Sequence, residues 1–157
     1  MLLGDLGATA VLAAKGELQR AELSLFRPIK SMLASPEPTA EAIWERFGDA
    51  SIVYVEDKFD GIRAQLHRGA SRVEIFSRDL RRMTDQFPDL ADHANQFNAE
   101  AILDGEIMAF AHGKKLTFFD LQKRLGRKHE GADLFATASA NVPVVFVAFD
   151  LLWMNGE

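Results

Sequence analysis

The spacing of apolar residues changes from a helical to an alternating pattern near residue 50. Before that point, residues 8–26 predict one or two short helices, and residues 39–47 predict a helix with Thr39 as its N-cap and Gly48 after its last residue. Three prolines between residues 28 and 38 favour an extended segment over residues 29–34. We expect the apolar residues of these helices and of the chain that follows them to face a core: Leu12, Leu18, Leu23, Phe26, Ile43, Trp44 and Phe47.

After residue 50, apolar and polar residues alternate. Residues 51–59, 62–67 and 72–77 predict strands, and the last two form a hairpin. The rest of the chain predicts helices over residues 87–97 and 118–125 and strands over residues 101–110 and 142–153. The last strand is apolar almost throughout, which predicts that both its faces are buried. Together these elements predict an α+β fold with largely antiparallel sheets and flanking helices.

Composition narrows the chemistry that is available. The chain has 157 residues, a formal net charge of −5 and no cysteine, which excludes disulfides, a thiolate nucleophile and cysteine-ligated metal sites. The four histidines are scattered, without the short spacings of a histidine-built metal site. No apolar run approaches the roughly 20 residues of a membrane-spanning helix, and an acidic residue stands where a signal peptide would carry basic ones. We therefore expect a cytoplasmic protein.

Basic residues gather in two stretches of this acidic chain. Residues 58–82 carry seven basic and three acidic residues, and residues 114–128 carry six basic residues and one acidic residue. Localised positive charge favours an anionic ligand such as a phosphate or a nucleic-acid backbone. Ordinary solvated surface charge explains the same pattern, so composition leaves both interpretations open.

The densest cluster of chemical groups runs from Glu56 to Arg63. On a strand, Glu56, Lys58 and Asp60 would share one face. A lysine with the ordinary pKa of about 10.4 is protonated at neutral pH. Partial desolvation and a nearby arginine would lower the pKa of Lys58 and make it a nucleophile. The alternative is a surface ion pair on an edge strand, and the residues alone do not decide between the two.

The segment Lys58-Phe59-Asp60-Gly61-Ile62-Arg63 resembles the KxDGxR signature of covalent nucleotidyltransferases, which are ATP-dependent DNA ligases, RNA ligases and mRNA capping enzymes. Residues 103–107 (LDGEI) and 146–152 (FVAFDLL) resemble the second and third signatures of this superfamily, in the same order. Residues 28–34 (PIKSMLA) and 149–157 (FDLLWMNGE) resemble flanking segments of ATP-dependent DNA ligases. By these motifs the sequence is identified as a member of the ATP-dependent DNA ligase family.

The resemblance implies a three-step reaction and a role for several residues. Lys58 would attack ATP to form lysyl-AMP, AMP would pass to the 5′-phosphate of a DNA nick, and the 3′-hydroxyl would then displace it. Glu56 matches the residue that binds the adenine amino group, and Arg63 matches an arginine at the nucleotide sugar or the nick phosphate. The implied cofactors are ATP and Mg²⁺, and the implied partner is nicked double-stranded DNA, without an obligate protein partner.

Three further residues match family positions. Arg78 corresponds to an arginine at the ribose and the 5′-phosphate, Glu106 to a carboxylate at the ribose close to the metal, and Phe149 to a ring that stacks on adenine. Each has a structural alternative: Phe149 could be core packing, and Asp104 with the glycine after it could mark a turn. Besides Arg63 and Arg78, we expect four basic residues near the DNA backbone: Lys123, Arg124, Arg127 and Lys128.

The resemblance also predicts how the chain is organised. Residues 1–26 would be the end of an upstream helical DNA-binding domain or a linker. Residues 27–157 would be the N-terminal part of a truncated adenylation domain with an ATP-grasp-like nucleotidyltransferase core. The family's later lysine motifs and its OB-fold domain would lie beyond residue 157, so we expect this segment alone to be weakly active or inactive. DNA repair, replication and recombination are the processes implied.

Two alternatives stay open at this point. The chain could belong to an RNA ligase or an mRNA-capping-type nucleotidyltransferase. It could also be a non-catalytic nucleotide- or DNA-binding remnant that retains the fold.

Overall fold

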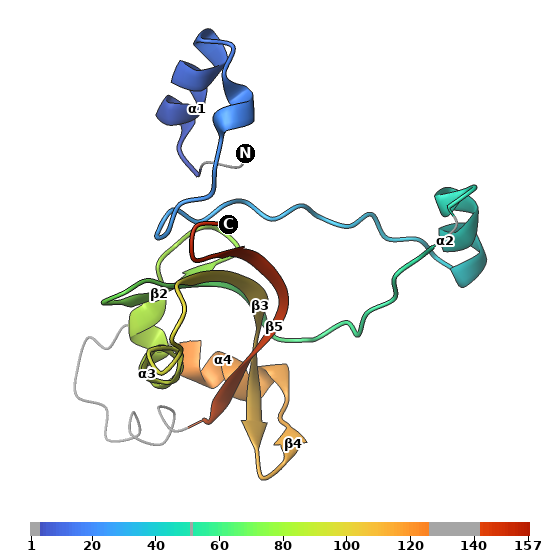
Figure 1. Ribbon diagram of the computed structural model, residues 1–157. Helices are drawn as coiled ribbons and strands as arrows, with labels where there is room; N and C mark the ends of the chain where they lie inside the picture. The colour runs from blue at the N-terminus through green and yellow to red at the C-terminus, as the bar shows by residue number, and fades with distance from the viewer. Residues whose placement is uncertain (1–3, 51, 126–141) are drawn as a thin grey trace.

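The computed structural model describes residues 4–50, 52–125 and 142–157 and shows a mixture of helices and one antiparallel sheet (Figure 1). The helices are α1 (Leu6–Ala14), α2 (Ala40–Phe47), α3 (Pro88–Ala94) and α4 (Phe118–Leu125), with short 3-10 turns at Leu18–Arg20 and Thr84–Gln86. The strands are β1 (Ile62–Arg68), β2 (Val73–Ser77), β3 (Ala101–Ala111), β4 (Lys114–Lys115) and β5 (Val144–Met154). The predicted α+β class is confirmed.

Strand order places β1 and β3 at the centre of the sheet. The order is β2-β1-β3-β4, β5 also pairs with β3, and every pairing is antiparallel. β1 and β2 form the predicted hairpin, and β4 turns back on the end of β3 through His112 and Gly113, both with positive φ. Because β3 has neighbours on both sides, its side chains are held at fixed positions relative to β1 and β5.

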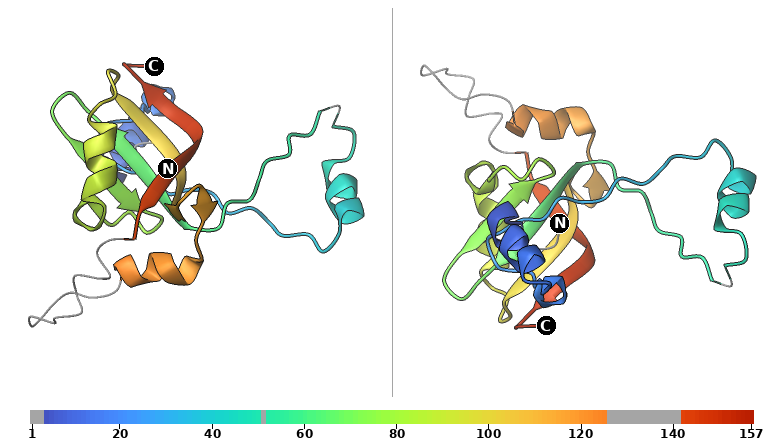
Figure 2. Two further views of the ribbon diagram at one scale, coloured as in Figure 1. Left: turned by 90° about the horizontal axis from the view of Figure 1, so that it is seen from below. Right: turned by 90° about the horizontal axis from the view of Figure 1, so that it is seen from above.

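One face of the sheet carries the apolar core. Alternating residues of β1 and β3, such as Leu66 and Ile107, pack with Phe87, Leu90 of α3 and Leu121 of α4. Figure 2 shows α1 on the opposite side of the sheet from α3. The helices predicted over residues 87–97 and 118–125 therefore form and cover this face, although α3 ends three residues earlier than expected.

Of the strand predicted over residues 51–59, the described part, residues 52–59, does not form a strand. Residues 52–60 have no regular secondary structure, and Tyr54 and Val55 are exposed. Residues 30–50 and 52–60 project from the sheet as a long arm that carries α2 at its far end (Figure 1). Among the described residues no strand pairs with this arm, so the alternating pattern has no sheet to join.

Helix α2 forms where the sequence predicts it, but its apolar face is not buried. The Thr39 hydroxyl accepts the N–H of Ala42, and Gly48 ends the helix with a φ of +54°. The prediction that its apolar residues face a core is wrong, because α2 lies on the arm: Ile43, Trp44 and Phe47 are exposed. Leu12, Leu23 and Phe26 are half-buried and Leu18 is exposed, so none of the N-terminal core candidates is fully buried.

The expectation that β5 is buried on both faces is also wrong. Within the described residues β5 pairs with β3 alone, so it forms an edge of the sheet, and Leu151 and Met154 are exposed. An apolar pocket of about 570 Å³ opens on the core side between α3 and β5. Its walls include Leu90, Leu103 and Phe146.

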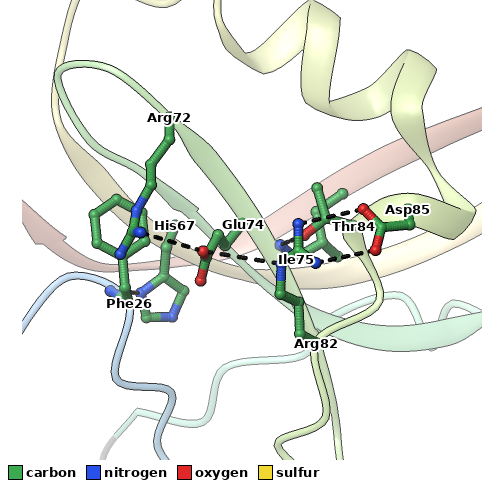
Figure 3. Close-up of polar contacts among 8 residues, drawn as sticks. All are labelled: Phe26, His67, Arg72, Glu74, Ile75, Arg82, Thr84 and Asp85. Atoms are coloured by element: carbon green, nitrogen blue, oxygen red, sulfur yellow. Dashed lines mark hydrogen bonds and ion pairs between the residues drawn. The ribbon is translucent and has the colours of Figure 1, made fainter.

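Residues 26–29 lie across the opposite face of the sheet. The N–H of Phe26 donates to Nδ1 of His67 at 2.9 Å, and the guanidinium of Arg72 lies 3.8 Å from the centre of the Phe26 ring (Figure 3). The side-chain amide of Gln65 both accepts from and donates to the backbone of Ile29. Burial lowers the pKa of His67 to about 4, so this imidazole stays neutral.

The described part of the chain contains no helix with the length and apolar character needed to cross a membrane.

Candidate active site

Three motif segments that are far apart in the sequence lie side by side in the sheet. Residues 58–61 lead directly into β1, residues 103–107 form the middle of β3, and residues 146–152 form the middle of β5. Arg63 pairs with Glu106 across β1 and β3, and Glu106 pairs with Val147 across β3 and β5. The antiparallel register therefore gathers the three motifs at one level of the sheet.

The polar residues of these motifs share the face opposite the core. Because side chains alternate along a strand, Arg63 points away from the face that buries Ala64, and Asp104 and Glu106 point away from the face that buries Ile107. The apolar core and the candidate site therefore occupy opposite faces of the same strands.

Arg63 is held by a two-pronged ion pair. Its Nε and Nη2 groups donate to the two carboxylate oxygens of Asp104 at 3.2 and 2.8 Å. The side chain of Asp104 is 7% exposed, whereas that of Arg63 is 35% exposed. The hydrogen bonds to Asp104 raise the pKa of Arg63, and the guanidinium lies 5.3 Å from the centre of the Phe149 ring.

Glu106 fixes the turn that follows the candidate nucleophile. Its Oε1 accepts the N–H of Gly61 at 3.0 Å. Burial raises the pKa of Glu106, while the bond from Gly61 and the positive charges of Arg63 and Lys58 oppose that rise. A Cβ at Gly61 would lie 2.2 Å from the carbonyl oxygen of Ile107, so this turn lies against β3 only because residue 61 is glycine.

Lys58 and Glu56 lie on the arm just before this turn. Both side chains are exposed, and they do not share a strand face with Asp60, because residues 52–60 are not a strand. Lys58 is close enough to Glu106 to act on its pKa. Asp60 forms a long ion pair of 3.9 Å with Lys115 of β4. The structure thus places the candidate nucleophile beside the gathered motifs, at the exposed edge of the site.

Arg78 continues the row of charged residues across the sheet. It is exposed and follows Ser77, which pairs with Ala64, so its register position is next to Arg63. Phe149 is 37% exposed, and its ring lies beside the guanidinium of Arg63. That placement argues against core packing as its main role. Asp104 lies within β3, which excludes a turn at that position.

The basic residues near α4 divide into two groups. The side chain of Arg124 is only 8% exposed, and its guanidinium pairs with Asp89 and donates to the carbonyl oxygens of Gln86 at 3.1 Å and Val142 at 2.8 Å. These contacts hold α4 against α3 and the start of β5, and they argue against Arg124 as a DNA contact. The side chain of Lys123 and all of Arg127 and Lys128 lie outside the described residues.

Sequence reasoning missed Asp104 as a functional candidate. A carboxylate in the middle of an otherwise apolar strand is a usable signal, because a buried charge needs a partner. The described residues contain no cluster of three or more acidic or histidine side chains that could enclose a metal ion.

The chain is similar in sequence to DNA ligases over its whole length. Residues 31–157 match the model of a family described as the ATP dependent DNA ligase domain. Over its whole length the chain is 47% identical to a probable DNA ligase of Koribacter versatilis, 42% identical to one of Opitutus terrae and 37% identical to a DNA ligase of Methanococcoides burtonii. It spans 26%, 18% and 28% of the length of these relatives, respectively.

Structural comparison gives the same result. The crystal structure of the ligase domain from M. tuberculosis LigD aligns with 65% of this chain and 30% of that domain, with a TM-score of 0.51 and 28% sequence identity. The family model covers most of the chain, including the three segments that the sheet brings together. The chain belongs to the ATP-dependent DNA ligase domain family.

Proposed function

We propose that this chain is the N-terminal part of the adenylation domain of an ATP-dependent DNA ligase that seals nicks in double-stranded DNA. The observation that carries the proposal is the meeting of the three motifs around one turn. Glu106 of β3 binds the N–H of Gly61, and Arg63 of β1 lies between Asp104 and the Phe149 ring. Residues 27–157 form this part of the domain, and residues 1–26 belong to a preceding DNA-binding domain or a linker.

Lys58 is the nucleophile of the proposed reaction. Its Nζ, once deprotonated, attacks the α-phosphorus of ATP, so that a nitrogen–phosphorus bond forms and the bond to the β-phosphate breaks with release of pyrophosphate. The 5′-phosphate of a nick then displaces the lysine and takes the AMP. Finally, the 3′-hydroxyl attacks that phosphate and releases AMP, which seals the strand.

The surrounding side chains orient the reactants. Phe149 stacks on the adenine and Glu56 accepts from its amino group, while Glu106 contacts the ribose. Arg63 and Arg78 offer guanidinium groups to the sugar and to the nick phosphate, where a planar fork matches phosphate oxygens. These contacts fix the reacting atoms in line and neutralise charge, which is most of what phosphoryl transfer requires of a protein.

Mg²⁺ fits this site as an ion shared with the nucleotide. One carboxylate oxygen of Glu106 accepts a hydrogen bond from Gly61, whereas both oxygens of Asp104 accept from Arg63. Of these two carboxylates, Glu106 therefore has an oxygen left for a metal ion. Mg²⁺ in phosphate sites is commonly held by one or two carboxylates together with phosphates and water. When bound, it would neutralise charge on the triphosphate.

Contact with nicked DNA is proposed for Arg63, Arg78, Lys123, Arg127 and Lys128. Because the chain as a whole is acidic, we expect the phosphate backbone of DNA to bind only where these cations lie. A protein that joins DNA acts where DNA is found, and we accordingly propose a cytoplasmic location.

The test is covalent labelling of the full-length gene product. Incubation with ATP is expected to add one AMP to the peptide that contains Lys58, and the adduct should disappear on addition of nicked DNA as the strand is sealed. Lys58→Arg retains the positive charge and should carry no adduct. Labelling by GTP alone would favour a capping-type enzyme, sealing of RNA nicks alone would favour an RNA ligase, and absence of any adduct would leave a binding module.

A further inference from the structure

Strand β4 brings a second lysine to the turn that follows Lys58. Nζ of Lys115 lies 3.9 Å from a carboxylate oxygen of Asp60, which belongs to that turn. Figure 2 shows β4 beside the point where the arm meets the sheet. The basic stretch over residues 114–128 therefore contains cations of two kinds: the side chain of Arg124 is buried inside the fold, whereas that of Lys115 reaches the candidate site.

The register of the β3–β4 hairpin determines which way Lys115 points. Lys115 pairs with Phe110, which lies four residues after Glu106 on β3. Residues an even number apart on a strand share a face, and directly opposed residues of antiparallel strands lie on the same face. Lys115 therefore lies on the face that carries the candidate site. Its neighbour Lys114 pairs with Ala111 and faces the other way.

Lys115 also lies at a defined end of the site. The pairing of β3 with β5 places Phe149 near the level of Asp104, before Glu106 along β3. Lys115 lies on the other side of Glu106, at a level about 13 Å further along the strand, and its side chain reaches back towards the turn. Since the proposed function binds the adenine at Phe149 and the α-phosphate at Lys58, Lys115 lies on the phosphate side of the site.

The ion pair between Lys115 and Asp60 is weak enough for a ligand to replace. Its atoms are 3.9 Å apart, which is beyond hydrogen-bond distance, and the two side chains are 46% and 65% exposed. Exposed ion pairs of this kind contribute little to stability. A phosphate offers oxygens that accept charge-assisted hydrogen bonds from an ammonium group, so a substrate phosphate can take the place of the Asp60 carboxylate.

We propose that Lys115 is a further binding residue of this site and holds a substrate phosphate other than the one that Lys58 attacks. The inference rests on the proposed ligase function and adds to it a contact from outside the three motifs. Two groups have the required chemistry: the β- and γ-phosphates of ATP in the first step, and the DNA backbone beside the nick in the later steps. In either case the ligand replaces Asp60 as the partner of the ammonium group.

The experiment compares Lys115→Gln with the wild type in the full-length gene product. The rate of Lys58–AMP formation is measured against ATP concentration, and the rate of sealing of a pre-adenylated nick against DNA concentration. We expect the KM for at least one of these substrates to rise about tenfold with little change in kcat, because one hydrogen bond to a charged group is lost. A higher KM for ATP identifies the nucleotide phosphates as the ligand, and a higher KM for the nick identifies the DNA backbone.

Two other variants separate position from charge. Lys114→Gln is the matched control, because it removes the same charge from the neighbouring residue that faces away, and it should keep the wild-type KM values. Lys115→Arg retains the charge and should restore most of the affinity. Where the nick is the ligand, Lys115→Gln should also reduce the slope of the salt dependence of DNA binding by about one. Both lysines are exposed, so all these variants should melt at the wild-type temperature.

Three results would overturn the proposal. One is a wild-type KM for both substrates in Lys115→Gln. Another is a lower kcat with unchanged KM values, which would mean that Lys115 acts by holding the turn at Asp60 and does not bind substrate. The third is an equal rise of KM in Lys114→Gln, which would show an effect of charge without position. A wild-type protein that neither forms Lys58–AMP nor seals nicks would instead refute the proposed function itself.

Discussion

Adding a single methyl group at Gly61 should slow adenylation without unfolding the protein. The Cβ of Gly61→Ala would lie 2.2 Å from the carbonyl oxygen of Ile107 and 3.0 Å from Cγ of Glu106. The first neighbour is backbone of the central strand β3 and cannot rotate away. The turn itself must therefore move outward, by about 1 Å to reach ordinary van der Waals contact.

That movement acts on both stability and rate. Overpacking of this kind typically costs about 1–3 kcal/mol, and the outward shift also stretches the 3.0 Å bond from Gly61 to Glu106. A displacement of about 1 Å near a reacting group can reduce a rate about 100-fold. Because Lys58 stands three residues before this glycine, we expect a loss of about that size in Lys58–AMP formation.

The assay is the single-turnover rate of AMP transfer to the full-length gene product, with the melting temperature measured in parallel. Gly7→Ala is the control, because its Cβ would meet only one neighbour, at an ordinary 3.4 Å, within helix α1. A wild-type adenylation rate in Gly61→Ala would refute the reasoning, since the turn would then not need to lie against β3. An equally large loss in Gly7→Ala would show that the assay does not detect the site.

Three other predictions concern single side chains. Phe149→Ala should raise the KM for ATP about tenfold with a small change in kcat, because base stacking on an aromatic ring contributes roughly 1–3 kcal/mol; steady-state kinetics against Phe149→Tyr checks it. Arg124→Met should lower the free energy of unfolding by about 2 kcal/mol in urea titrations and leave the salt dependence of DNA binding unchanged, because Arg124 bonds to Asp89 inside the fold. The contribution of His67 to the free energy of unfolding should be complete above about pH 6.5 and fall by roughly 3 kcal/mol as the pH drops towards 4, because the folded state keeps the imidazole neutral while the unfolded chain gains a proton. His67→Gln should abolish this pH dependence in urea titrations at pH 7 and 5.

Local signals in the sequence predict the bounds of most helices and strands to within a few residues. Thr39 and Gly48 cap α2 as predicted, and the hairpin of β1 and β2 follows from alternation and a short turn. Burial was harder to predict, because it depends on what lies against an element rather than on the element itself. Trp44 is 64% exposed on a well-formed amphipathic helix, and the apolar strand β5 has an unpaired edge within the described chain.

In the candidate site, too, the sequence predicts the face on which each side chain lies but not which residues of neighbouring strands meet. Alternation alone places Arg63 on the polar face of its strand and Asp104 on the polar face of another. It does not say which residues of two strands stand opposite each other, because register is set by the whole pairing of β1 with β3. Once Gln65 stands opposite Asp104, the long side chain of Arg63 reaches the carboxylate diagonally, as neighbours two positions apart in a sheet can. A shift of one residue would turn Asp104 into the core beside Leu66, where its charge would have no partner, so the ion pair and the apolar core favour the same register.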